Sequence, residues 1–149
     1  MSDNVAFDEF VERHEPSLRR ALAGHVPAHQ VDDALSEAFL YAFANWHRVQ
    51  DMHSPAGYLF RVAQSKSRVG RRVLMPPVPS DDARDRIEPG LIDAMRSLPS
   101  QQRSAVWLVH GCGWTYAEVA EALGITRSAV GTHVTRGLTS VRRRLGVEQ

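Results

Sequence analysis

The chain has 149 residues, 43% of them hydrophobic, and a formal net charge of +1. This length suits one ordinary domain or two small ones, and the apolar content suffices for a core, which excludes disorder throughout. No apolar run approaches the roughly 20 residues that span a bilayer, and the polar start of the chain has no signal-peptide pattern. A single cysteine, Cys112, excludes an internal disulfide framework, so we expect a cytoplasmic protein.

The first half of the chain predicts three helices. Apolar residues at helical spacing indicate a helix over about 5–24, which Pro16 must kink or divide, and a second helix over about 30–46. After a polar loop, Ser54 and Pro55 form a strong helix start, with serine as the N-cap and proline in the first helical position. The third helix becomes increasingly basic toward its end. Residues 61–72 contain no acidic residue, and their basic residues are Arg61, Lys66, Arg68, Arg71 and Arg72.

A linker separates the two halves of the chain. Residues 73–90 contain four prolines and four acidic residues, a composition typical of a partly extended connection. We therefore place an N-terminal domain at 1–72 and a C-terminal domain at 91–149. The second half shows helical patterns only, and no strand pattern stands out in the chain. The predicted fold class is all-α, with two small helical domains joined by the Pro-rich linker, the second domain containing a helix-turn-helix.

The most specific motif runs from Thr115 to Arg136. Thr115 and Glu118 have the spacing of a capping box, in which each residue satisfies a backbone N–H of the other. Gly124 supplies the positive φ that ends the first helix, and Thr126 caps a second one. Two short helices joined by a tight glycine-containing turn form a helix-turn-helix, whose second helix enters a DNA major groove. An ordinary αα-hairpin is the alternative.

The second helix of this motif presents a polar face. Four apolar residues repeat at steps of three and four and must pack inward: Val130, Val134, Leu138 and Val141. The side chains left on the outer face of the first turns can meet base edges and phosphates, and they are Arg127, Ser128, Thr132, Thr135 and Arg136. Gly131 lies on the same face, where a missing side chain permits a close backbone approach to DNA or has no role.

The charge distribution supports nucleic-acid binding. A second basic run over residues 124–145 also contains no acidic residue. Basic side chains that neutralise phosphates release condensed counterions, so two such runs in separate halves indicate two phosphate-contacting surfaces. Solvated helix faces are the alternative for each run alone. The acidic residues near the start of the second helix interact favourably with the helix dipole. Alternatively, they form part of a protein-binding edge.

Two further features have alternative interpretations. Trp46 stands beside a polar loop near the basic third helix, where an exposed ring would stack on an unpaired base; otherwise Trp46 closes the core. His110 and Cys112 are two candidate metal ligands, but no C-x-x-C or H-E-x-x-H pattern accompanies them. The sequence contains neither a paired nucleophile nor a glycine-rich phosphate loop, so we predict no enzymatic activity and no cofactor.

Taken in order, these segments resemble an RNA polymerase sigma factor of the small, two-domain extracytoplasmic-function type. Residues 31–46 look like the family's polymerase-binding helix, and residues 54–63, running on to Arg72, look like its promoter-reading helix. Residues 98–106, followed by the helix-turn-helix, look like its C-terminal domain. The resemblance covers nearly the whole chain, in the family's order and with its linker between the domains.

The resemblance implies that the chain binds core RNA polymerase and directs promoter-specific initiation of transcription. The residues implied to dock on the coiled coil of the β′ subunit are Asp32, Asp33, Leu35, Ser36, Glu37 and Leu40. The residues implied to melt and read the minus-ten element are Trp46, His47, Arg61, Lys66, Arg68, Arg71 and Arg72, with one base flipped into the loop before Ser54. The helix-turn-helix would read the minus-thirty-five element, its domain would sit on the β flap, and an anti-sigma factor is a further implied partner.

Three positions depart from the family's usual residues. Ser36 stands where the family usually has Gln, Ser65 where it has Asn, and Gly131 near a usual basic residue. Two other functions remain open. One is a stand-alone helix-turn-helix regulator that dimerises through its first half, and the other is a metal- or redox-sensing protein based on His110 and Cys112.

Overall fold

The structure is a computed structural model that describes residues 2–66 and 89–146. All regular elements within these ranges are helical, as predicted, and none is a strand. The first half contains α1 (Ser2–Ala23), η1 (Ala28–Gln30), α2 (Val31–Ala44), α3 (Trp46–Val49) and α4 (Pro55–Lys66). The second half contains α6 (Leu91–Arg96), α7 (Ser100–Val106), η2 (Trp107–Gly111), α8 (Tyr116–Leu123) and α9 (Arg127–Leu145). Most of the predicted linker lies outside the described residues, as do Arg68, Arg71 and Arg72.

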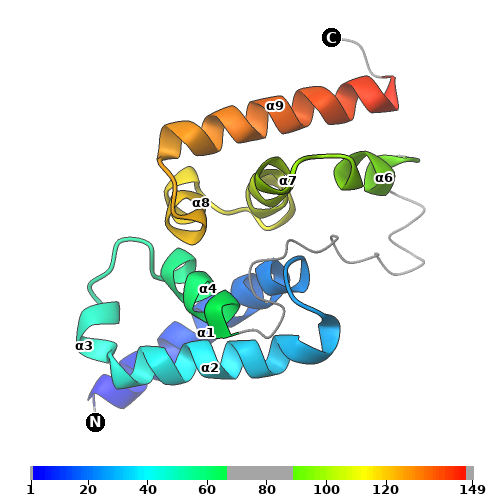
Figure 1. Ribbon diagram of the computed structural model, residues 1–149. Helices are drawn as coiled ribbons and strands as arrows, with labels where there is room; N and C mark the ends of the chain where they lie inside the picture. Colours follow the sequence, from blue (N-terminus) through cyan, green and yellow to red (C-terminus); the bar gives the residue numbers. More distant parts are fainter. Residues whose placement is uncertain (1, 67–88, 147–149) are drawn as a thin grey trace.

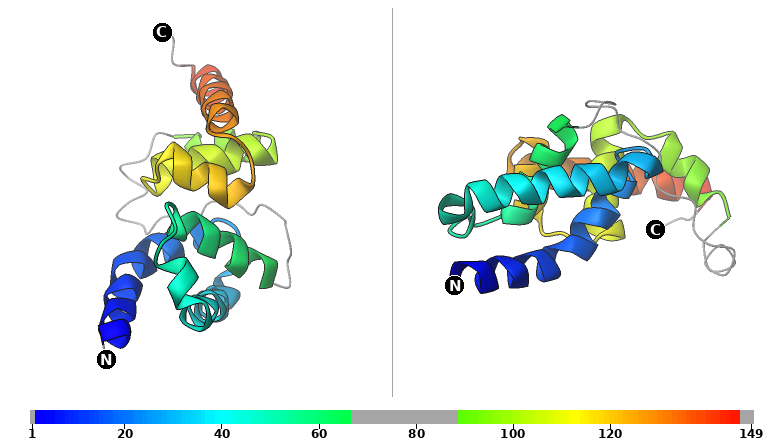
Figure 2. Two further views of the ribbon diagram at one scale, coloured as in Figure 1. Left: turned by 90° about the vertical axis from the view of Figure 1, so that its left-hand side faces the viewer. Right: turned by 90° about the horizontal axis from the view of Figure 1, so that it is seen from below.

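The helices form two layers that face each other (Figures 1 and 2). Helices α1, α2 and α4 pack together in one layer, α7, α8 and α9 lie in the other, and α8 packs directly against α4. Gly57 lies at this contact, where a Cβ atom would come within 2.4 Å of the backbone oxygen of Glu118. A glycine is therefore what allows α4 and α8 to approach so closely.

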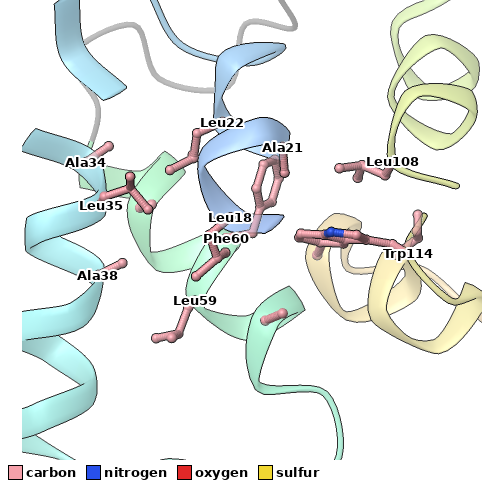
Figure 3. Close-up of a cluster of buried hydrophobic side chains, with 14 of the residues drawn as sticks. Leu18, Ala21, Leu22, Ala34, Leu35, Ala38, Leu59, Phe60, Leu108 and Trp114 are labelled. Atoms are coloured by element: carbon pink, nitrogen blue, oxygen red, sulfur yellow. The ribbon is translucent and has the colours of Figure 1, made fainter. Parts of the chain in front are cut away.

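One hydrophobic core serves both halves of the chain (Figure 3). The fully buried Phe60 of α4 meets the ring of Trp114 edge to face, with centroids 5.7 Å apart. A favourable aromatic pair of this kind adds to the large apolar area that each ring buries. Residues from both halves that have no exposed surface include Leu18, Leu22, Leu59, Phe60, Leu108 and Val119. In this conformation the two predicted domains therefore meet through shared packing.

Two hydrogen bonds, one buried and one partly buried, also join the halves. The His25 side chain is 1% exposed, and its Nδ1–H donates to the carbonyl oxygen of Ala21 at 2.9 Å. This bond fixes the tautomer, so Nε2 accepts from the hydroxyl of Ser104 at 2.6 Å. The Trp114 Nε1–H donates to the hydroxyl of Ser17 at 2.6 Å. Both bonds satisfy polar atoms that would otherwise be costly to bury.

Burial of His25 makes the stability of the fold sensitive to mild acid. Burial, with a smaller contribution from Arg103, lowers the pKa of His25 to about 4, against an ordinary value of 6.5. Between these pH values the unfolded chain takes up a proton that the folded chain cannot, so stability falls as the pH drops from 6.5 toward 4. We expect the free energy of unfolding to be about 2 kcal/mol lower at pH 5 than at pH 7 from this group.

Urea unfolding at the two pH values measures this loss. A His25→Gln variant, whose amide can replace both hydrogen bonds, is expected to lose much less stability over the same interval. A smaller loss remains in the variant because burial also lowers the pKa of His14. Equal losses in the two proteins would refute the assignment to His25.

Three predicted boundaries differ from the structure. Helix α1 continues through Pro16 as one helix, so the proline starts no second helix. The second helix ends at Ala44, because Asn45 leaves helical geometry and its side-chain amide donates to the carbonyl of Tyr41. The predicted polar loop therefore begins with the short helix α3, which buries Val49 completely.

The helix predicted over 100–109 changes form instead of ending there. It is α-helical in α7 and continues as the π-helical turn η2, in which the Cys112 N–H donates to the carbonyl of Trp107 at 3.0 Å. The Trp107 ring lies against two glycines, since a Cβ atom at Gly24 or Gly111 would come within 2.6 Å or 2.3 Å of it. The π-helical turn η2 thus places the large Trp107 indole between the backbone at Gly24 and the backbone at Gly111. Neither residue has a side chain that would overlap with the ring.

Candidate nucleic-acid interface

The helix-turn-helix has the geometry that its sequence predicts. The Thr115 hydroxyl accepts from the backbone N–H of Glu118 at 3.1 Å, and the Glu118 carboxylate accepts from the backbone N–H of Thr115 at 2.9 Å. Gly124 ends α8 with a φ of +69°, and the Thr126 hydroxyl caps α9 by accepting from Ala129 at 3.0 Å. The capping box, the glycine turn and the second cap are therefore all confirmed.

Helix α9 exposes the residues predicted to meet DNA. Val130, Val134 and Val141 are buried, while Leu138 is half-buried. The five predicted contact residues are all exposed: Arg127, Ser128, Thr132, Thr135 and Arg136. The Thr132 hydroxyl donates to the backbone carbonyl of Ser128 at 3.2 Å, which leaves its oxygen free to accept. The face therefore combines two cationic side chains with three hydroxyls.

A packing contact accounts for Gly131. A Cβ atom at this position would come within 3.3 Å of the Tyr116 ring, which belongs to the first turn of α8. The ring covers the glycine and is itself 42% exposed. Tyr116 is thus an aromatic side chain beside the recognition helix that sequence reasoning missed, because no local pattern pairs residues 116 and 131.

The residues predicted to melt and read the minus-ten element differ in their exposure. His47 and Arg61 are exposed, and one Arg61 Nη1 lies 3.5 Å from a carboxylate oxygen of Glu121 on α8. Trp46 packs in an aromatic cluster with Phe7 and Phe10, at centroid distances of 5.4 and 5.2 Å. Lys66 ends α4. In this conformation Trp46 helps to close the core, as the alternative interpretation held, while Arg61 faces the helix-turn-helix.

A tyrosine pair joins α2 to α4. The Tyr41 and Tyr58 hydroxyl oxygens are 2.9 Å apart, and the Arg48 guanidinium donates to the Tyr41 hydroxyl. The hydrogen bond with Tyr41, with burial as a lesser cause, raises the pKa of Tyr58. Tyr58 is one turn before Arg61 and lines both grooves beside the α4–α8 contact, of about 630 and 540 Å³. Sequence reasoning did not identify this cluster as part of the site.

The outer face of α2 carries most of the predicted polymerase-binding residues. Asp33, Ser36, Glu37 and Leu40 are exposed. Asp32 is also exposed, but its carboxylate lies 2.7 Å from Arg19, which also pairs with Glu15 at 2.6 Å. The prediction that Leu35 docks on polymerase is wrong in this conformation, because Leu35 is 4% exposed and packs in the core. It is buried because it belongs to the apolar stripe of α2.

The proposed metal or redox pair has no supporting geometry. Burial raises the pKa of the Cys112 thiol to about 12, which keeps it protonated at neutral pH and therefore a poor nucleophile and metal ligand. Within residues 2–66 and 89–146 no three His, Cys, Asp or Glu side chains lie close enough together to hold a metal ion. In the same ranges no helix is both long and apolar enough to cross a membrane.

Comparisons with known proteins find similar proteins over nearly the whole chain. The family model for sigma-70, region 4 matches residues 90–141, which include α7, α8 and most of α9. An RNA polymerase sigma-E factor of Streptomyces antibioticus is 29% identical, the match covering 95% of this chain and 85% of that protein. The ECF RNA polymerase sigma factor SigM of Mycobacterium tuberculosis is 28% identical, over 97% of this chain and 79% of the relative. The chain is thus similar over nearly its whole length to RNA polymerase sigma factors, one of them of the extracytoplasmic-function type.

Solved structures show that the fold is shared. CnrH, determined in complex with the cytosolic domain of CnrY, superposes with a TM-score of 0.65 at 23% identity, covering 98% of this chain and 91% of CnrH. RpoE of Bartonella quintana, determined with the anti-sigma factor NepR, gives a TM-score of 0.67 at 17% identity, with coverages of 97% and 99%. These two structures show a shared fold, and the curated relatives support the function of a sigma factor that directs initiation of transcription. Sigma factors are not an enzyme family.

Proposed function

We propose that the two halves of this sigma factor read two separate promoter elements. The recognition helix α9 would enter the major groove of the minus-thirty-five element with Arg127 and Arg136, and its hydroxyl residues would contact phosphates or base edges. Helix α4 and the loop before it would melt and read the minus-ten element, with Arg61 on the backbone. The observation that carries the proposal is the exposed polar and basic face of a correctly capped α9.

The same proposal assigns the outer face of α2 to core RNA polymerase. Asp33, Ser36, Glu37 and Leu40 are exposed on one side of this helix, away from both DNA-reading elements. The C-terminal half would sit on the β flap while α9 is on DNA. The chain would do this work in the cytoplasm, with no covalent chemistry and no cofactor of its own. An anti-sigma factor is a further proposed partner, since the similar RpoE was solved with one.

Promoter reading by both halves requires them to separate. The minus-ten and minus-thirty-five elements are about 25 base pairs apart, or roughly 85 Å along B-form DNA. In this conformation α4 packs on α8, and Glu121 pairs with Arg61. The described conformation is therefore proposed to be that of the free chain, and engagement of polymerase and promoter would open the contact between α4 and α8.

Transcription with purified core enzyme tests the function. Promoters are first found by sequencing transcripts after overproduction of the chain, because shared upstream elements give both recognition sequences. We expect core enzyme plus this chain to start transcripts at these promoters, and neither component to do so alone. The stand-alone regulator predicts the opposite: tight binding to a palindromic duplex without polymerase and no core-dependent transcript.

A further inference from the structure

A titratable group lies at the centre of the contact between the two halves. Apart from the indole of Trp114, only two polar side chains of the described residues are buried, His25 at 1% and Ser104 at 2% exposure. His25 follows α1 in the first half, Ser104 belongs to α7 in the second half, and the two are bonded to each other at 2.6 Å. The buried polar contact between the halves therefore depends on a group that can take up a proton.

The surroundings of the His25 imidazole favour its neutral form. From α1 the carbonyl of Ala21 accepts from Nδ1–H, and from α4 the ring of Phe60 meets the imidazole edge to face, with centroids 4.8 Å apart. Among the described residues, Arg103 on α7 is the one charged group that acts on the imidazole, so no carboxylate compensates a proton on it. An imidazolium at this place would be a buried charge near a second cation.

His14 on α1 is less sensitive to protonation than His25. Its ring is half-buried beside Phe10, at a centroid distance of 4.5 Å. Burial, with a smaller contribution from Arg13, lowers the pKa of His14, but the carboxylate of Glu118 on α8 opposes this change. The closed arrangement therefore tolerates a proton on His14 better than a proton on His25.

Separation of the two halves would change the surroundings of His25. Helix α7 would carry Ser104 and Arg103 away, and the side of the imidazole that they cover would become accessible to water. The pKa of His25 is about 4 in the closed chain, and in the open chain it would return toward its ordinary value of 6.5. Between these pH values the open chain binds a proton that the closed chain does not, so acid favours the open chain.

We propose that the bond between His25 and Ser104 is an acid-sensitive switch, in which the neutral imidazole holds the two halves together and a proton on His25 opens them. The inference rests on the proposed function, in which the halves separate to engage polymerase and promoter. Mild acid would then increase the amount of open chain directly, without a second protein. The ratio of open to closed chain should rise about threefold between pH 7 and pH 6, and on the order of twentyfold between pH 7 and pH 5.

The single cysteine is a probe of this opening. Burial raises the pKa of the Cys112 thiol to about 12, and Arg20 on α1 opposes the rise, so the thiol lies near the first half of the chain. Because the thiolate is the reactive form, dithiodipyridine should label Cys112 only when the halves part or the chain unfolds. The labelling rate, divided by the rate of the urea-unfolded chain at the same pH, gives the open fraction.

The variants separate His25 from other sources of pH dependence. The open fraction of the parent chain should rise on the order of twentyfold between pH 7 and pH 5, and that of His25→Gln less than about threefold, the remainder coming from His14. His29→Gln is the matched control, because His29 is exposed, and it should behave like the parent. Ser104→Ala leaves Nε2 of His25 without its partner and should raise the open fraction at pH 7 about tenfold.

Two results would overturn the inference. One is an equal pH dependence of labelling in the parent and in His25→Gln, together with an unchanged open fraction in Ser104→Ala. The other is an open fraction that equals the unfolded fraction from urea unfolding at each pH, because acid would then only unfold the chain.

A titration with core enzyme distinguishes the switch from the proposed function. If only the open chain engages polymerase, the apparent core affinity of the parent relative to that of His25→Gln should rise about threefold between pH 7 and pH 6. Opening that depends on His25 without this change in affinity would support the switch and remove the proposed need for the halves to separate.

Discussion

Replacing Gly57 with leucine is expected to force α4 away from α8 and to destabilise the closed arrangement of the two halves. The added Cβ atom would lie 2.4 Å from the backbone oxygen of Glu118 and 3.0 Å from the Cβ atom of Glu121. Neither atom is the end of a flexible side chain, so the overlap can be relieved only by moving a helix. Overpacking of this kind costs about 1–3 kcal/mol, and the gain in helix propensity on replacing glycine offsets up to about 1 kcal/mol of it.

Two measurements separate opening from general damage. The free energy of unfolding in urea should fall, and the fluorescence of the interface tryptophans should change before the main transition, because Trp114 is 4% exposed only while the halves are packed. Ser65→Leu is the control, since Ser65 is exposed on the same helix. If promoter use requires the halves to part, Gly57→Leu should still support core-dependent transcription at low temperature. An unchanged stability in Gly57→Leu would mean that α4 and α8 are not packed in the free chain.

Local rules were enough to predict the helix-turn-helix. The capping box at Thr115, the left-handed Gly124 and the cap at Thr126 each depend on residues within a few positions of one another, and all three are present. The outward direction of Arg127 and Arg136 followed from the 3.6-residue period of the buried valines on α9. The exposed polar face of α9 could therefore be predicted nearly completely.

Contacts between distant segments could not be predicted in the same way. The His25–Ser104 bond spans 79 positions and the Trp114–Ser17 bond spans 97, and no local pattern signals either. The same limit explains Trp46, whose partners Phe7 and Phe10 are far away in the sequence. For Leu35 the periodicity and the family resemblance pointed to different roles, and packing decided in favour of the periodicity.

Replacing both Arg127 and Arg136 with alanine is expected to abolish most upstream recognition while leaving polymerase binding intact. The two side chains are nine residues apart on α9, about 14 Å along the helix axis and half a turn apart around it, so they lie on opposite flanks of the helix and can reach separate phosphates or bases at the two sides of a groove. Removing one good bidentate interaction with a base costs about 1–3 kcal/mol. We therefore expect promoter affinity of the assembled enzyme to fall on the order of ten- to a hundredfold.

The position of Arg127 argues that such a loss would not come from unfolding. It is the first residue of α9, where the positive end of the helix dipole disfavours a cation, so its removal should if anything stabilise the helix. Arg96→Ala is the matched control, because Arg96 is an exposed arginine of the same half that lies on α6, outside the basic run. Promoter binding measured over a range of salt should also show a slope lower by about 0.9 for each phosphate that the variant no longer neutralises. A double variant with unchanged affinity and salt slope, while α9 remains folded, would place upstream recognition on another surface.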